Sequence, residues 1–305
     1  MQRLPSPSPA LALPAGVPFS DPASVDAWDA WFRWREEGQL RDISIDATWQ
    51  RVAIALSKAV PPDEAPHWEQ RLRAALTSWC FLPDERILAT AGTRRIGWTR
   101  ELSGVINVAA AVRYPLSPRS NWDAAAYFAS AQTGLCALRC AAALVSGPCA
   151  PVRLTLGVVG FADALALLDI PYASDRAIEL ARQVREHIRR AVASTRHAPA
   201  SACAVAVEAD DGNADSPGVI AVSGEPSHPR LALLANNLTD GLEPLNITDQ
   251  QVRIDGSHRT LRSSGMALEF ARRHSDAAHV KRLIEGAQAT LEGRRAIYLA
   301  FGADT

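Results

Sequence analysis

The sequence predicts an α/β protein that is rich in helices. Apolar residues recur at helical spacing in the first 80 residues and again at 174–193, and residues 123–146 form an Ala-rich stretch with few charges. Short runs of Val, Ile and Ala at 203–208 and 218–222 are typical of strands. We therefore expect helices packed against a small number of strands.

The first half is predicted to be mainly helical. Ser24 can cap a first helix, a second helix begins after Asp46 and ends before Pro61, and a third covers residues 64–79. The tryptophans on these helices repeat on one face, away from the charged side chains, and a stripe of this kind is typical of a hydrophobic core.

The second half alternates helical and strand-like segments. Residues 153–168 are apolar, the amphipathic pattern of 174–193 follows, and a last helix is predicted over 277–292. All eight tryptophans fall at or before residue 122, which indicates two differently built regions. We divide the chain into a disordered Pro-rich tail (1–20), a helical N-terminal region (21–122) and a second region (123–305).

Composition excludes several classes of protein. The 32 Lys and Arg residues balance 33 Asp and Glu residues, which argues against a nucleic-acid-binding protein, because such proteins usually carry a basic face. No uninterrupted uncharged apolar run is long enough to predict a membrane span. Five cysteines among 305 residues do not predict a disulfide framework, so we expect reduced thiols and a cytoplasmic protein.

The cysteines and histidines predict no metal site. The seven histidines include no pair four residues apart, and the sequence holds no Cys-x-x-Cys motif. Cys136 and Cys140 lie four residues apart on a predicted helix and, with Cys149, are candidate redox thiols; small buried side chains in an Ala-rich helix are the more common role of such cysteines.

Three segments resemble adenosylcobalamin-dependent ribonucleotide reductases. Residues 81–93, which include Arg-Ile-Leu-Ala and end in Ala-Gly-Thr, resemble a stretch near the start of the family's catalytic region. Residues 153–172 resemble its Gly-Val-x-Gly-x-Ala-Asp segment and the following Ile-Pro-Tyr, and residues 234–244 resemble its Gly-Ile-Glu-Pro element. The residues that match the family motifs are Arg86, Gly92, Thr93, Gly157, Gly160, Asp163, Gly241, Glu243 and Pro244.

The resemblance implies a fold and a chemistry. Family members close a ten-stranded α/β barrel around a radical cysteine, a pair of reducing cysteines and a carboxylate base, and use adenosylcobalamin. This chain is too short for that barrel, so the second region is expected to be an incomplete reductase-type α/β barrel. Because an incomplete barrel exposes strand edges, a protein partner or self-association is also expected.

The chain departs from the family where the chemistry is carried. Asn107 is followed by Val108 where the family has Asn-Cys, and the Asn-x-Cys-x-Glu loop with the radical cysteine and the base has no counterpart. The family's phosphate-binding loop falls near residues 228–231, which lack its hydroxyls and glycine. Losing several groups of a cooperative site removes most of its rate.

Two functions follow from these departures. The first is a reductase-like pseudoenzyme that acts by binding a partner or a nucleotide, with no cofactor required. The alternative is a component of an active reductase that converts ribonucleotides to deoxyribonucleotides, uses adenosylcobalamin and receives the missing loop from another chain. Whether the chain is an enzyme is left open between them.

Overall fold

The computed structural model describes residues 21–94, 96–99, 101–146, 153–195, 208–209, 219–224, 228–246, 250–254, 256–261 and 265–302. Its helices are α1 (Pro22–Ala27), the π-helical turn η1 (Trp28–Phe32), α2 (Ile45–Ser57), α3 (Ala65–Thr77), α4 (Glu85–Thr90), the 3-10 turn η2 (Ala109–Ala111), α5 (Ala124–Ser146), α6 (Phe161–Leu167), α7 (Asp175–Thr195), α8 (Pro229–Leu234), α9 (Met266–His274), α10 (Ala277–Gly286) and α11 (Leu291–Phe301). Its strands are β1 (Arg35–Glu36), β2 (Gln39–Leu40), β3 (Phe81–Pro83), β4 (Glu101–Asn107), β5 (Val112–Arg113), β6 (Asn121–Trp122), β7 (Arg153–Val159), β8 (Glu208–Ala209), β9 (Val219–Ser223), β10 (Gln250–Ile254) and β11 (Ser257–Leu261).

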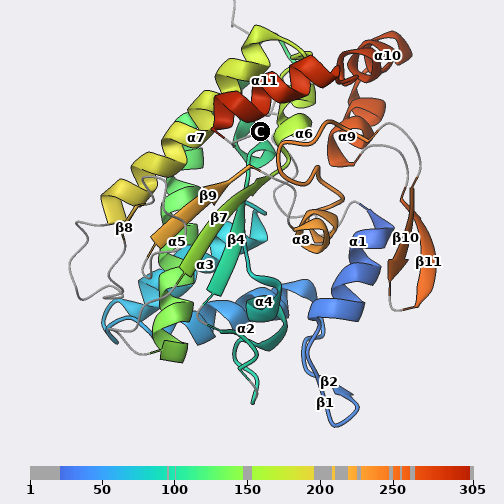
Figure 1. Cartoon of the computed structure of the whole chain (residues 1–305). Coiled ribbons are helices and arrows are strands. Elements are labelled where there is room, and N and C mark those ends of the chain that lie inside the picture. Colours follow the sequence, from blue (N-terminus) through green and yellow to red (C-terminus); the bar gives the residue numbers. More distant parts are fainter. Residues whose placement is uncertain are drawn as a thin grey trace, which may run out of the picture.

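A five-stranded sheet lies at the centre of the molecule (Figure 1). Its strand order is β3-β4-β7-β9-β8; β3 runs antiparallel to β4, and the other four strands are parallel. The helix-rich α/β class predicted from the sequence is therefore confirmed. The described strands form an open sheet and not a closed barrel, and the sheet alone does not identify the reductase type of barrel.

The sheet carries helices on both faces. On one face, α5 packs along β3 and β4 and against α7, so the two long helices that connect the parallel strands lie together (Figure 1). Gly134 of α5 allows this close approach, because a Cβ there would come within 2.6 Å of the Phe81 ring. On the other face, His228 at the start of α8 lies over Gly157 of β7.

The tryptophans of the N-terminal region pack inward, as predicted. Trp28, Trp49, Trp68 and Trp98 are buried in one hydrophobic cluster that extends from η1 to α11. The Trp28 indole also donates a hydrogen bond to the Thr48 hydroxyl at 3.0 Å, which satisfies its polar edge inside the core.

Several predicted elements differ from the observed ones. Asp21 caps α1 in place of Ser24, whose hydroxyl instead donates to the Leu233 carbonyl. The single helix predicted over 277–292 is two helices, because α10 ends at Gly286 and the Thr290 side chain caps the start of α11. The helices predicted over 123–146 and 174–193 are confirmed as α5 and α7.

The predicted regions meet in the sheet. Strands β3 and β4, from residues 21–122, pair with each other, and β4 also pairs with β7 of the second region, so the N-terminal region is not purely helical. The division into regions stays a prediction. The Pro-rich tail (1–20) and most of the strand predicted at 203–208 lie outside the described residues.

Helix α5 is long and apolar enough, by composition, to cross a membrane. In the structure 56% of its most apolar window is buried, as expected of a core helix. A single helix of this kind is weak evidence that the chain crosses a membrane.

One edge of the described sheet is a short strand. Edge strand β3 spans three residues and ends in Pro83. Short edges and edge prolines both disfavour pairing with another chain. Self-association through an open strand edge remains a prediction.

Candidate functional site

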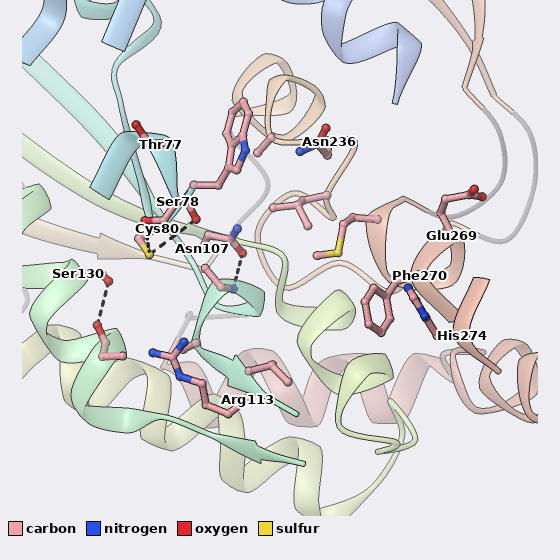
Figure 2. Close-up of a pocket in the computed structure, with 18 of the residues that line it drawn as sticks. Thr77, Ser78, Cys80, Asn107, Arg113, Ser130, Asn236, Glu269, Phe270 and His274 are labelled. Carbon is pink, nitrogen blue, oxygen red and sulfur yellow. Dashed lines mark hydrogen bonds between the residues drawn. The ribbon is translucent and has the colours of Figure 1, made fainter. Parts of the chain in front are cut away.

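A cavity of about 330 Å³ lies at the carboxyl end of β4 (Figure 2). The end of α3, β5, α5 and α9 supply its walls, together with the chain after α8. In open sheets with parallel strands, ligands commonly bind beyond the carboxyl ends of the strands. The cavity is at the lower end of the size range of small-molecule sites. Its apolar walls include Trp79, Ala110, Val112, Leu238, Met266 and Phe270.

Two residues that line this cavity have a strained backbone. Trp79 has φ 57° and Asn236 has φ 65°, both in the left-handed region. This conformation is uncommon for any residue except glycine, and it is a marked outlier for a bulky side chain such as tryptophan. Each such residue costs about 1–3 kcal/mol, and strain of this kind concentrates at functional sites. Asp169 and Asn237, which line two other hollows, also have positive φ, so the strain alone does not single out this cavity.

Asn107, the last residue of β4, is the most deeply buried polar side chain in the cavity wall. Only 6% of its surface is exposed. Its Oδ1 accepts hydrogen bonds from the backbone N–H groups of Ala109, at 2.9 Å, and Ala110, at 3.3 Å, which holds the start of turn η2. Both partners are donors, so oxygen must face them, and this fixes the orientation of the amide. The other amide atom, Nδ2, has no partner among the described residues.

The arginines of the cavity are already paired. Arg113 donates to Asp123 at 3.2 Å, and Arg273 donates to Glu269 at 3.0 Å. The Ala126 backbone N–H, with Arg113 as a further contributor, holds the pKa of Asp123 below its ordinary value. The Asp123 carboxylate is therefore charged at neutral pH, and each of the two arginines has a carboxylate partner.

A thiol and a carboxylate both reach the cavity, on opposite sides. Cys80 lies beside Asn107, whereas Glu269 lies on α9 across the opening (Figure 2). The Ser78 hydroxyl is 3.2 Å from the Cys80 sulfur, and Glu269 is occupied by Arg273. This arrangement does not place a carboxylate base beside a thiol.

The second and third segments that resemble the reductase family contact each other at the end of β7, whereas the first segment pairs with β4, which lies between it and β7 in the sheet. The backbone N–H of Asn107 donates to the carbonyl of Cys80, the residue before the first segment. Gly160 donates to the Thr239 carbonyl at 2.7 Å, and Gly241 donates to the Val158 carbonyl at 3.1 Å. Segments that are far apart in the sequence therefore meet beside the cavity.

Gly160 must be glycine where β7 turns into α6. It has φ 72°, and a Cβ there would lie 2.7 Å from Asn107 Oδ1. A side chain would strain the backbone and push on the amide that lines the cavity. The predicted motif residue Gly160 thus acts on the site through Asn107. Gly157, by contrast, lies within β7 under His228.

Asp163, predicted as a motif residue, is completely buried and joins three elements. Its carboxylate accepts from the Thr239 N–H at 2.8 Å, the Thr239 hydroxyl at 2.9 Å and the Ala267 N–H at 3.3 Å. Burial raises the pKa of this carboxyl, and the three hydrogen bonds oppose that rise. Asp163 does not line the cavity. Its hydrogen bonds fix Thr239 and the start of α9, and the neighbouring residues Leu238 and Met266 line the cavity.

Arg86, Gly92 and Thr93 lie at the other end of β4. Arg86 forms an ion pair with Asp84 at 2.7 Å and donates to the Glu101 carbonyl at 2.6 Å. Gly92 and Thr93 form the turn after α4, where the Thr93 hydroxyl donates to the Thr90 carbonyl. These three predicted residues shape the fold and do not reach the cavity.

Glu243 and Pro244 line a separate, open hollow beside β10 and α8. Glu243 accepts from Tyr298 at 2.6 Å and pairs with Arg294, so it ties the 241–246 loop to α11. Gly241, just before it, has φ 59°. The structure does not bring this motif pair to the cavity.

The candidate redox thiols do not line the cavity either. Cys136 and Cys140 lie one turn apart on α5; Cys140 is buried and Cys136 is half-buried. Cys149 lies outside the described residues. Among the residues that the structure describes, no group of three His, Cys, Asp or Glu side chains is arranged to hold a metal ion.

Sequence reasoning missed most of the cavity wall. Cys80 and Asn107 flank the predicted segments, so their places at the ends of strands could have singled them out. Phe270 and His274, whose rings stack with centroids 4.4 Å apart, come from α9, for which no motif or strong pattern gave a signal.

Comparison with known proteins identifies no family. No family model matches the chain, and no curated protein matches its sequence.

Proposed function

We propose that this chain is a non-catalytic, reductase-like protein that works by binding, with the cavity at the end of β4 as its small-molecule site. Ribonucleotide reductase is the family that its three motif segments resemble. A nucleotide-related ligand and a protein partner are the two kinds of molecule that such a protein binds.

The contact between the second and third resembling segments, residues 153–172 and 234–244, carries this proposal. At the carboxyl end of β7, the Gly160 N–H donates to the Thr239 carbonyl and the Gly241 N–H donates to the Val158 carbonyl. Residues that shape the backbone are retained at the place where a related enzyme would bind its substrate.

The absence of reductase chemistry is supported by the residues at the same place. Val108, where the family has a cysteine, is fully buried, and its N–H donates to the Val159 carbonyl at 2.9 Å. Cys80 and Glu269 lie on opposite sides of the cavity (Figure 2). A radical thiol and its base would have to lie close together on the same substrate.

The cavity does not fit adenosylcobalamin. A corrinoid is far larger than a space of about 330 Å³. We therefore propose no reaction step that uses this cofactor.

The test is an assay of ribonucleotide reduction. The purified chain is incubated with adenosylcobalamin, dithiothreitol and each ribonucleoside di- or triphosphate, beside an active reductase as the positive control. We expect no deoxynucleotide above the protein-free blank. Product from the chain alone would overturn the proposal. Product formed only when a second polypeptide carries an Asn-x-Cys-x-Glu loop would instead support a role as a reductase component.

A further inference from the structure

We propose that the cavity at the end of β4 binds an uncharged heteroaromatic ligand of the nucleobase or nucleoside class, and that it rejects the phosphorylated forms. This inference rests on the proposed binding function and specifies its ligand. Three features carry it: an unused donor on a buried side chain, acceptors opposite an apolar wall, and arginines that are already paired with carboxylates.

The unused donor is Asn107 Nδ2. The side chain is nine-tenths buried, and its Oδ1 is held by two backbone N–H groups, so the amide cannot turn to hide its nitrogen. Figure 2 shows the oxygen engaged and the nitrogen on the side away from that contact. Because two backbone N–H groups hold the oxygen, the nitrogen is the atom of this amide that is left to donate to a ligand acceptor. A ring nitrogen or carbonyl oxygen of a nucleobase is such an acceptor.

The acceptors are the hydroxyl oxygens of Ser78 and Ser130. Each hydroxyl already gives its proton to a carbonyl of its own helix, that of Ala74 at 2.7 Å and that of Ala126 at 2.9 Å. Their oxygens can therefore only accept further hydrogen bonds. A ligand that fits must offer donors as well as an acceptor, as the hydroxyls of a nucleoside do.

The apolar wall suits a flat ring. The Phe270 ring on α9 lies across the cavity from Asn107 (Figure 2), and Met266 and Trp79 also line the space. Aromatic rings and thioethers make favourable contacts with a planar heterocycle.

The cations of the cavity oppose binding of phosphate. Of the described residues that line it, the arginines are Arg113 and Arg273, and each is paired with a carboxylate. A phosphate bound to either arginine would lie beside the carboxylate of Asp123 or Glu269, and the like charges would repel each other. An uncharged ligand has no such penalty.

The experiment measures the shift in melting temperature of the full chain with adenosine, guanosine, cytidine, uridine and their 5′-mono-, di- and triphosphates, followed by calorimetric titration. We expect at least one nucleoside to raise the melting temperature, because binding to the native state stabilises it. We expect its phosphates to bind at least tenfold more weakly. Asn107→Asp keeps an oxygen for the two backbone N–H groups but removes the donor, so nucleoside binding should weaken by about tenfold or more. Gln50→Glu, the same amide-to-carboxylate change on the exposed face of α2, is the matched control and should bind as the wild type does.

Each other outcome counts against the inference. Binding of the phosphates alone, lost in Arg113→Gln or Arg273→Gln, would overturn the uncharged class but leave the proposed binding function standing. Nucleoside binding that Asn107→Asp leaves intact would overturn the assigned donor. No shift with any compound would overturn the inference, whereas the proposed non-catalytic role is judged separately by the reduction assay.

Discussion

The two ends of β4 differ in what their polar groups do. At the amino end, the Asp84 carboxylate accepts from the Arg86 backbone N–H, the Arg86 guanidinium and Ser103, so its hydrogen-bonding capacity is used within the chain. At the carboxyl end, Asn107 keeps a donor for the cavity, and the nearby backbone is strained at Trp79. At one end of the strand the carboxylate is fully used within the fold, and at the other an amide donor is left facing the cavity.

Removal of the Asp84 carboxylate should have the largest effect on stability. Asp84→Ala removes the cap of α4 and leaves the Ser103 N–H and the Arg86 guanidinium without their acceptor. We expect a loss of about 2–4 kcal/mol in the free energy of unfolding, measured by urea denaturation. Ligand binding by the folded fraction should be unchanged. Weakened binding at full folding would show that the two ends are not independent.

Gly160→Ala should have the next largest effect, and it should reach both stability and binding. The left-handed backbone and the 2.7 Å approach to Asn107 Oδ1 should cost about 1–3 kcal/mol and displace the amide. Gly38→Ala is the matched control, because Gly38 has φ 76° but open space around it. A loss of binding in both variants, or in neither, would contradict the link between Gly160 and the cavity.

Acid should weaken the contribution of Asp84 at the amino end of β4. Burial alone would raise the pKa of Asp84, but the hydrogen bonds and charge of Arg86 outweigh burial and lower it. A carboxyl whose pKa is lower in the folded state stabilises the fold above its ordinary pKa, about 4, and this contribution is lost as the pH falls through the folded-state pKa. Urea denaturation between pH 7 and pH 3 should therefore show a steeper acid loss in the wild type than in Asp84→Asn. Equal slopes would contradict this assignment.

The smallest effect is expected from the thiols of α5. Cys136→Ala combined with Cys140→Ala should leave the ligand-induced melting shift unchanged, because neither side chain lines the cavity. The melting temperature without ligand should fall, since Cys140 is buried. If the double variant lost ligand binding, the site would have to extend to α5 beyond Ser130.

Local patterns predicted the elements that carry a strong periodic signal. The amphipathic repeat of α7 and the uncharged Ala-rich stretch of α5 identified both helices within a few residues. The sequence could not show that Thr290 starts a new helix after Gly286, because chain direction there depends on packing against α7. Strands β3 and β4 were hidden within a region whose tryptophans indicated helices.

The site was less predictable than the fold. The motif residues Gly160 and Asp163 were singled out, but their roles are to allow a close approach and to fasten α9, which only the folded contacts reveal. Phe270 and His274 lie more than 150 residues from Asn107 in sequence, so their meeting depends on tertiary structure. Arg86 was predicted as a motif residue, but it forms an ion pair with Asp84 at the amino end of β4, away from the cavity.

Hydrogen exchange of the full chain, with and without saturating adenosine, guanosine, cytidine or uridine, tests most directly whether the carboxyl end of β4 is the binding site. With a nucleoside that raises the melting temperature, exchange should slow in residues 109–113 and 266–274, which form opposite walls of the cavity. Exchange in α4, at the amino end of β4, should stay the same. Slowed exchange in α4 or in the hollow beside Glu243, with residues 109–113 unaffected, would contradict the account.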